Sequence, residues 1–329
     1  MVRCMRSLVD RLLGGRSLER QGGVDGSDAT ARARLALEGL SIGDAFGERF
    51  FIGDDARALA LIAGRVVPDG PWRWTDDTAM AIVVTEELTR HAGLDPDRLA
   101  HGFARRYLAD PARGYGRGTH EVLGAIARGV PWPQANRLGF LDGSKGNGAA
   151  MRSAPIGAFF AGDNERIVEA ARVSALPTHA HPDAIAGAIA VALAAGYAST
   201  AATNHRPSAL LAFVTEHLPV GPVADGIRRA SAMAGASPEQ AAHALGSGAR
   251  VLAEDTVPFA LWCADRHLDA FEEALWATVS GLGDRDTTCA IVGGIVACAG
   301  TSDDLPAVWR ARREAIPAAR PATWASPLT

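Results

Sequence analysis

The chain has 329 residues, 48% of them hydrophobic, which is enough for one large buried core or two ordinary domains. Its 33 basic and 37 acidic side chains leave a formal net charge of −4, which excludes the strongly basic surface of a protein that binds nucleic acid without sequence preference. The four cysteines show neither a C-x-x-C pair nor a Cys/His ligand spacing, so we expect buried thiols in a reducing, cytoplasmic compartment.

The N-terminal stretch, residues 1–28, carries five arginines and lacks a sustained apolar region with a small-residue cleavage site, so it is not typical of a secretory signal. We expect it to be a flexible extension. No shift in composition marks a boundary after it, and we therefore expect one domain over residues 29–315. Residues 316–329 are predicted to form an irregular tail.

Apolar residues recur at three- and four-residue spacing along most of the chain, and this spacing predicts helices. The predicted segments are 29–47, 78–91, 95–110, 118–130, 164–179, 184–202, 207–218, 237–246, 271–283 and 287–300. Segment 184–202 is long enough to cross a membrane, but it is mostly Ala and Gly, so we expect a buried helix and no membrane partner. Strand signals are scarce. The sequence predicts an all-α, compact, orthogonal multi-helix domain, with a monomer as the default.

Two clusters of carboxylate and hydroxyl side chains stand directly before unusually apolar helices. The first is Thr75, Asp76 and Asp77, and the second is Asp284, Asp286 and Thr287. Either cluster alone is typical of an ordinary helix N-terminus. If the two buried helices converge, however, four carboxylates would repel one another and lose hydration. Hard divalent cations relieve that repulsion, so the pair of clusters predicts two metal ions, Mg²⁺ or Mn²⁺, at the centre of the fold.

Three further stretches carry candidate binding or catalytic groups. The glycine-rich segment 141–157 precedes a helix and can aim N–H groups at a phosphate; its central residues are Ser144, Lys145, Gly146, Asn147 and Gly148. In "THAHPD" we expect His179 to be a binding-loop histidine, not a metal ligand. In "GDAFGERFF" the helical pattern runs into glycines, and Glu48 is the carboxylate nearest a central site, although an ordinary loop residue explains it equally well.

Five stretches occur in the order found in the ADP-ribosylglycohydrolases: "GLSIGDAFGERF", "WTDDTAM", "GNGAAMRSAPIG", "THAHPD" and "GDRDTTCAIVGGIVA". They extend from about residue 32 to about residue 300. The chain thus resembles this family. The resemblance implies an all-α fold with a two-metal centre and a hydrolase that removes ADP-ribose from an acceptor. An arginine-type N-glycosidic linkage is the default, with O-linked and nucleobase-linked ADP-ribose as alternatives.

The resemblance also implies roles for individual residues. Thr75, Asp76 and Asp77 would hold one cation, while Asp284, Asp286 and Thr287 would complete the pair. The loop from Ser144 to Gly148 would bind the diphosphate, and His179 would flank it. Asp76, Asp77 and Glu48 are the catalytic candidates.

The chain departs from the family pattern at three positions that bear on these roles. Lys145 stands where members often have an aromatic residue that stacks on adenine, and Phe140 is nearby. Phe51 stands where members often have a glutamate, and Glu48 is a candidate to replace it. Arg285 separates the two aspartates of the second cluster and adds a positive charge there. Two other functions fit the same residues, namely a two-metal nucleotide phosphohydrolase and a non-catalytic ADP-ribose-binding protein.

Overall fold

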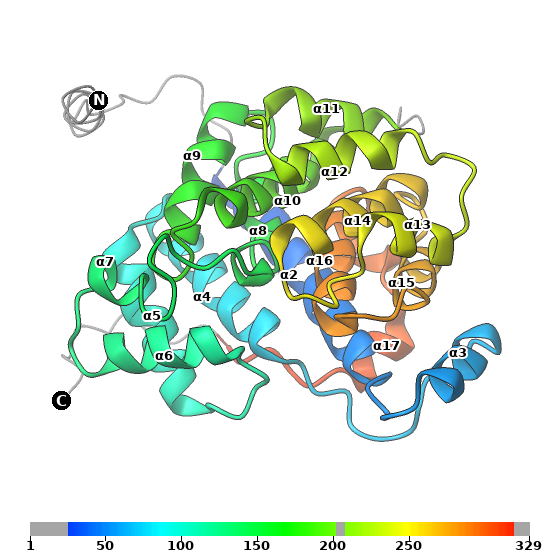
Figure 1. Cartoon of the computed structure of the whole chain (residues 1–329), viewed down its shortest axis with the longest axis horizontal. Coiled ribbons are helices and arrows are strands. Elements are labelled where there is room, and N and C mark those ends of the chain that lie inside the picture. The colour runs from blue at the N-terminus through cyan, green and yellow to red at the C-terminus, as the bar shows by residue number, and fades with distance from the viewer. Residues whose placement is uncertain (1–25, 202–207, 319–329) are drawn as a thin grey trace.

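The structure is a computed structural model that describes residues 26–201 and 208–318 (Figure 1). The described residues form sixteen α-helices and two 3-10 helices, and they form no strand beyond two isolated bridges. The expected all-α fold is confirmed. Most of the predicted extension and tail, residues 1–25 and 319–329, lie outside the described residues.

The helices are, in chain order, α2 (Gly26–Glu48), α3 (Asp55–Ala63), α4 (Asp76–His91), α5 (Pro96–Ala109), α6 (Arg117–Ala127), α7 (Trp132–Ala135), η1 (Asn147–Ala149), α8 (Ala154–Phe159), α9 (Asn164–Ala175), α10 (Pro182–Ala201), α11 (Ala209–His217), α12 (Pro222–Ser231), α13 (Pro238–Leu245), α14 (Ala253–Arg266), α15 (Phe271–Val279), α16 (Arg285–Ala297), η2 (Ser302–Asp304) and α17 (Ala307–Arg312).

Several helices begin or end differently from the sequence prediction. The first helix does not stop at Gly47 but continues to Glu48. Helix α9 ends at Ala175 instead of reaching residue 179. Its C-cap residue Leu176 keeps helical φ and ψ, but the next residue, Pro177, has no N–H group to continue the helical hydrogen bonds. Helix α14 was not predicted, and it contains Pro258 in its interior, a residue that normally interrupts a helix.

Helices α2 and α16 lie side by side at the centre of the fold (Figure 1). Gly39, Gly43 and Gly47 recur every four residues and therefore share one face of α2. A Cβ atom at Gly43 would lie 2.0 Å from the carbonyl oxygen of Cys289, and one at Gly47 would lie 2.1 Å from that of Arg285. Only glycine permits this approach of two backbones. The contact fixes the first turn of α16 against the last turns of α2.

Helix α10 is the one described helix that is long and apolar enough to cross a membrane. Of its apolar stretch Pro182–Thr200, 67% is buried inside the fold. Its small side chains pack against α8, α9 and α14, as expected for a helix of the core. The prediction of a buried helix for this segment therefore agrees with the structure.

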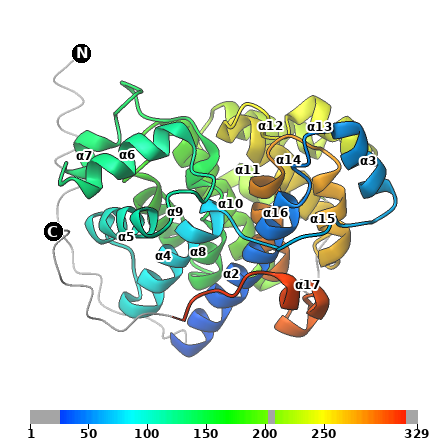
Figure 2. The same cartoon turned by 90° about the horizontal axis from the view of Figure 1, so that it is seen from below.

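The segment after α17 returns past α2 and packs beside the residues that precede α4 (Figure 2). The Glu314 N–H donates to the carbonyl oxygen of Trp72 at 2.8 Å. The Glu314 carboxylate accepts two hydrogen bonds from Arg113, at 2.6 and 2.8 Å, and Arg113 also donates to the carbonyl oxygen of Trp74 at 2.9 Å. The C-terminal segment thus supports the start of α4 from outside.

Candidate active site

The N-terminus of α4 is held by partners from its own first turn and from α2. The Thr75 hydroxyl accepts from the N–H of Asp77 at 3.4 Å and donates to the Asp77 Oδ2 atom at 2.9 Å. Asp44, which is completely buried on α2, accepts from the N–H groups of Thr75 and Thr78 at 3.0 Å and from the Thr78 hydroxyl at 2.6 Å. Asp44 therefore acts as a cap for α4 that is supplied by a different helix.

The N-terminus of α16 is held through the glycine-rich loop. Asp284 is the N-cap residue, but its side chain makes no capping hydrogen bond to its own helix. Instead its Oδ2 atom accepts from the Asn147 side-chain amide at 2.7 Å, and that amide also donates to the Thr256 hydroxyl at 3.0 Å. One turn further, the Thr287 hydroxyl reaches the Asp77 Oδ2 atom at 3.4 Å. The two predicted clusters therefore meet.

Burial and mutual repulsion dominate the electrostatics of this carboxylate cluster, which comprises Asp44, Asp76, Asp77, Asp284 and Asp286. Burial raises the pKa of Asp44 to about 6. Burial, with added repulsion from Asp44, raises the pKa of Asp76 to about 8. The pKa values of Asp77 and Asp286 lie well above the ordinary range, first because of burial and then because each carboxyl faces the other cluster members. The cluster therefore favours uptake of protons or cations.

Two oxygens of the cluster suit a hard cation. The Oδ1 atoms of Asp77 and Asp286 are buried without a hydrogen-bond partner, which is costly for a carboxylate unless something positive is bound. The donor set of aspartate and threonine oxygens is the type that Mg²⁺ and Mn²⁺ prefer. Over the described ranges, however, no group of three or more His, Cys, Asp or Glu side chains stands in ligating geometry. The chemistry of the cluster fits a metal, and the number of ions stays a prediction.

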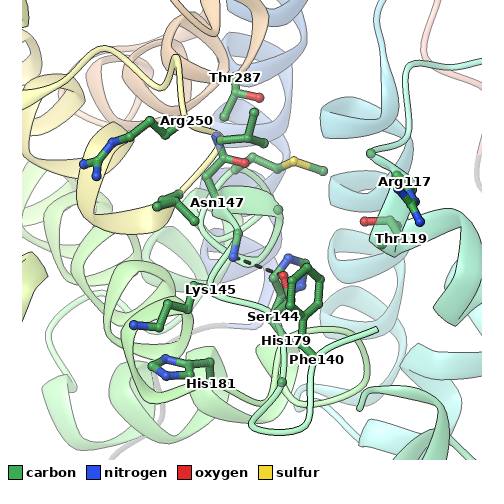
Figure 3. Close-up of a pocket in the computed structure, with 18 of the residues that line it drawn as sticks. Arg117, Thr119, Phe140, Ser144, Lys145, Asn147, His179, His181, Arg250 and Thr287 are labelled. Carbon is green, nitrogen blue, oxygen red and sulfur yellow. Dashed lines mark hydrogen bonds between the residues drawn. The ribbon is translucent and has the colours of Figure 1, made fainter. Parts of the chain in front are cut away.

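A cavity of about 620 Å³ opens above the cluster. Asp76, Asp284, Asp286 and Thr287 line it at the cluster end, and so does the loop from Ser144 to Gly148. Arg117 and Thr119 lie on one side, while Arg250, Lys145 and His181 lie on the other (Figure 3). Thr75, Asp77 and Glu48 are not among the lining residues. The volume suits a small-molecule ligand.

The predicted phosphate loop uses part of its hydrogen-bonding capacity inside the protein. The Gly146 N–H donates to the Ser144 hydroxyl at 3.1 Å, and the Asn147 N–H donates to the carbonyl oxygen of Val251 at 3.2 Å. The Lys145 ammonium lies 3.1 Å from a carboxylate oxygen of Asp183. These contacts fix the shape of the loop, and its role in substrate binding stays a prediction.

His179 lies beneath this loop and lines the cavity (Figure 3). Burial, reinforced by the positive charge of Arg152, lowers its pKa to about 3, so the imidazole is neutral at physiological pH. Its Nδ1 atom lies 2.7 Å from the Thr178 hydroxyl. The role of His179 as a binding-loop histidine stays a prediction.

Two of the residues that depart from the family pattern, Phe51 and Arg285, contact each other. The guanidinium carbon of Arg285 lies 4.9 Å from the centre of the Phe51 ring. The guanidinium donates to the carbonyl oxygen of Phe50 at 2.6 Å and to the carboxylate of Asp55 at 2.5 Å. The positive charge of Arg285 is thus directed towards the segment between α2 and α3. Glu48 is half-buried at the end of α2, where burial raises its pKa.

Sequence reasoning missed Asp44 and Arg152. The signal for Asp44 was present, because it is a lone charge in the apolar part of a predicted helix that continues after it. Arg152 follows the glycine-rich loop directly, and it is completely buried although arginine is seldom fully buried. Its pKa falls to about 9 because of burial, and the negative charge of Asp76 partly opposes that effect.

Comparisons with known proteins agree on one family. The family model described as ADP-ribosylglycohydrolase matches residues 25–325. An uncharacterised protein of Archaeoglobus fulgidus is 30% identical over 286 residues, covering 84% of this chain and 89% of the relative. The ADP-ribosylhydrolase ARH3 of Homo sapiens is 28% identical over 325 residues, covering 85% of this chain and 88% of the relative.

A solved structure shares the fold. The chain titled "ADP-ribosylglycohydrolase-related protein complex" superimposes with a TM-score of 0.56 at 24% sequence identity, covering 86% of this chain and 92% of the other. The family model spans nearly the whole chain, and the expectation of a glycosidic-bond hydrolase is confirmed at the level of the family. The chain belongs to the ADP-ribosylglycohydrolase family.

Proposed function

We propose that this protein hydrolyses the glycosidic bond between ADP-ribose and an acceptor, in a reaction that depends on two divalent cations, Mg²⁺ or Mn²⁺. The observation that carries the proposal is the buried carboxylate cluster at the end of a ligand-sized cavity, with unpartnered oxygens on Asp77 and Asp286. The family supports removal of ADP-ribose in general. An arginine-type N-glycosidic linkage is the default acceptor chemistry, with O-linked and nucleobase-linked ADP-ribose as the alternatives.

The cations would be held by the two helix ends that meet at the cluster. The proposed ligands are Thr75, Asp76 and Asp77 from α4, and Asp284, Asp286 and Thr287 from α16. When bound, such cations hold ribose hydroxyls and polarise a water near the anomeric carbon. Their positive charge would also keep the cluster ionised, which burial alone opposes.

Proton transfer and substrate binding would be carried out by side chains of the protein. Asp76 lines the cavity, so its carboxylate is a candidate to accept a proton from water and return it to the leaving group. Asp77 is the second candidate for this role. Asn147 holds the Asp284 carboxylate in place. The loop from Ser144 to Gly148, with Lys145 and His179, would bind the diphosphate at the spectator end of the substrate.

The mouth of the cavity offers a surface for the adenine. Phe140 lines the cavity, and 52% of its side chain is exposed, which is unusual for a large apolar group and typical of a binding site. We propose that the adenine stacks on this ring. The Phe140→Ala variant should weaken binding of ADP-ribose and leave binding of ribose 5-phosphate unchanged, as measured by calorimetry.

A hydrolysis panel tests the proposal as a whole. Arginine-linked, serine-linked and nucleobase-linked ADP-ribose are each incubated with Mg²⁺, Mn²⁺ or EDTA, and the products are separated. Release of free ADP-ribose that stops in EDTA supports the proposal. Release of phosphate or AMP would instead identify a nucleotide phosphohydrolase, and tight binding of ADP-ribose without turnover would identify a non-catalytic binder.

We also propose that the protein is a cytoplasmic monomer. In support, the three cysteines within the described ranges, Cys263, Cys289 and Cys298, are all buried and unpaired, as expected for a reducing compartment. Light scattering coupled to size exclusion would measure the mass in solution. A mass twice that of one chain would overturn the monomer.

A further inference from the structure

Arg152 is completely buried and lies directly behind the glycine-rich loop. Its guanidinium donates to the carbonyl oxygen of Gly148 at 3.1 Å and to that of Ser174 at 2.6 Å, and it packs 4.4 Å from the centre of the Phe103 ring. Among the described residues, no carboxylate forms an ion pair with Arg152. The hydrogen-bond acceptors of Arg152 are therefore neutral groups around the loop.

One of those acceptors connects Arg152 to the cavity. The guanidinium donates to the Thr178 hydroxyl at 3.0 Å, and the same hydroxyl lies 2.7 Å from the Nδ1 atom of His179. Both side chains are buried, with 2% of Thr178 and 4% of His179 exposed. Arg152, Thr178 and His179 thus form a linear chain of hydrogen bonds from the core to the cavity wall.

The chemistry of the three groups orders the protons along this chain. A guanidinium can only donate, so the Thr178 oxygen is the acceptor of the bond from Arg152. Among the described residues, His179 Nδ1 is the only acceptor within reach of the Thr178 hydroxyl proton, so the arrangement that uses this proton has Nδ1 as the acceptor. A neutral imidazole that accepts at Nδ1 carries its proton on Nε2. The neutral state itself agrees with the burial of His179, which lowers its pKa to about 3.

The Nε2 edge of His179 faces the loop and the cavity. A Cβ atom at Gly146 would lie 3.2 Å from Nε2, and one at Gly148 would lie 3.1 Å from it, so both glycines leave the space that the ring occupies. Within the described part of the chain, Nε2 has no hydrogen-bond partner in the protein, and His179 lines the cavity. A fixed N–H donor is therefore presented to whatever binds against the loop.

We propose that Arg152 and Thr178 are positioning residues that fix His179 as the Nε2–H tautomer, so that it donates to an anionic oxygen of the bound ADP-ribosyl ligand. The proposal rests on the proposed function for the identity of the ligand. The tautomer itself depends only on the protein.

The first test replaces the hydroxyl and keeps the shape of the side chain. Thr178→Val removes the proton that His179 Nδ1 accepts, whereas Thr178→Ser retains it. A hydrogen bond to a charged group has a strength that corresponds to about a 10- to 100-fold change in affinity. We expect that weakening of ADP-ribose binding for Thr178→Val, and a change below about twofold for Thr178→Ser.

Kinetics separate positioning from general damage to the fold. The contact involves the spectator part of the substrate and is made equally in the ground and transition states. Thr178→Val should therefore raise KM and leave kcat nearly unchanged. Thr278→Val is the matched control, because Thr278 is a fully buried threonine on α15 whose hydroxyl donates to the Ala274 carbonyl oxygen at 2.6 Å, away from the cavity. It should lower the melting temperature without changing KM.

A second measurement needs neither substrate nor activity. Long-range ¹H–¹⁵N correlation spectra of the ligand-free protein report which ring nitrogen is protonated, and His179→Gln identifies the signals of His179. We expect a protonated Nε2 in the wild type and in Thr178→Ser, and a mixture of tautomers in Thr178→Val. This measurement remains decisive if Thr178→Val folds poorly.

The outcomes separate the two proposals. A wild-type protein that does not bind ADP-ribose contradicts the proposed function, whatever the tautomer. A wild type that binds ADP-ribose but carries its proton on Nδ1 overturns the positioning role, and so does unaltered binding by Thr178→Val. The combination of an Nε2–H tautomer, weakened binding in Thr178→Val and recovery in Thr178→Ser supports it.

Discussion

The two helix ends that meet at the carboxylate cluster are built differently. At α4, the Thr75 hydroxyl and the Asp44 carboxylate accept backbone N–H groups, so the end is satisfied within two packed helices. At α16, the Asp284 side chain caps nothing and is held by the Asn147 amide from a loop that lines the cavity. The α4 end is therefore held by the packed helices themselves, whereas the α16 end is coupled to the loop where the ligand is expected.

The largest expected effect comes from the α16 end. Asp286→Asn should abolish both turnover and the stabilisation of the wild type by metal, which is about 2.7 kcal/mol at 100 times the dissociation constant. In EDTA the same variant should melt above the wild type, because it removes one of several buried like charges.

Calorimetric melting of Asp286→Asn with EDTA and with millimolar Mg²⁺ or Mn²⁺ checks both expectations. Asp303→Asn is the control, because Asp303 is an exposed aspartate outside the cavity, and it should behave as the wild type. A wild-type melting temperature that does not respond to either cation would remove the metal from the site.

Glu48, at the end of α2, tests whether a residue outside the two helix ends takes part in catalysis. It follows Gly47, whose backbone packs on that of Arg285 at the α16 end. If Glu48 replaces the family glutamate missing at Phe51, Glu48→Gln should lower kcat by about 10²–10⁴-fold and reduce metal affinity much less. Steady-state kinetics measure the effect, with Glu165→Gln as the control at an exposed glutamate on α9. Full activity of Glu48→Gln would show that this protein works without that glutamate.

Asn147→Ala breaks the link between the loop and α16. The substitution leaves the partly buried Asp284 carboxylate without its amide donor, and such a loss costs about 1–3 kcal/mol. We expect ADP-ribose affinity to fall by that amount, as measured by calorimetry. Asn164→Ala is a control, since its amide contacts the imidazole of His217 far from the cavity lining. If Asn147→Ala and Asn164→Ala bind ADP-ribose equally well, the contact between Asn147 and Asp284 does not couple the loop to the α16 end.

The metal-free protein should respond to pH at the cluster. Burial raises the folded-state pKa values of Asp44 to about 6 and of Asp76 to about 8, both above the ordinary value of 3.8 for an exposed aspartate. The folded state therefore binds more protons than the unfolded state between about pH 4 and pH 8, and stability falls as pH rises through that window. Melting temperatures in EDTA should drop from pH 5 to pH 8. Saturating Mg²⁺ should flatten or reverse the trend, and a rise in EDTA would contradict the folded-state pKa values.

The sequence predicted the parts of the site that obey local rules. Helix N-termini are indicated by the positions of Thr75, Asp77 and Asp284 in the sequence. The apolar segments that follow these residues indicate that both helix ends are buried. Long-range partners follow from packing instead. Asp44 reaches Thr75 because α2 packs against α4. No spacing in the sequence indicates that Asn147 lies beside Asp284. Arg285 shows what the sequence alone cannot predict. It lies between Asp284 and Asp286 in the chain, but its guanidinium contacts Phe51, away from the carboxylates.

The pairing of α2 with α16 also affects when the protein can fold during synthesis. The helix that opens the described chain buries its glycine face only against the helix that nearly closes it, and synthesis adds about 5–20 residues per second. During that interval the groove along Gly39, Gly43 and Gly47 is uncovered and open to chaperones. A nascent chain that ends before Arg285 lacks the partner of that groove, and it also lacks Asp286 and Thr287 of the proposed ligand set. The complete carboxylate cluster can therefore form only after the segment that carries α16 has been synthesised.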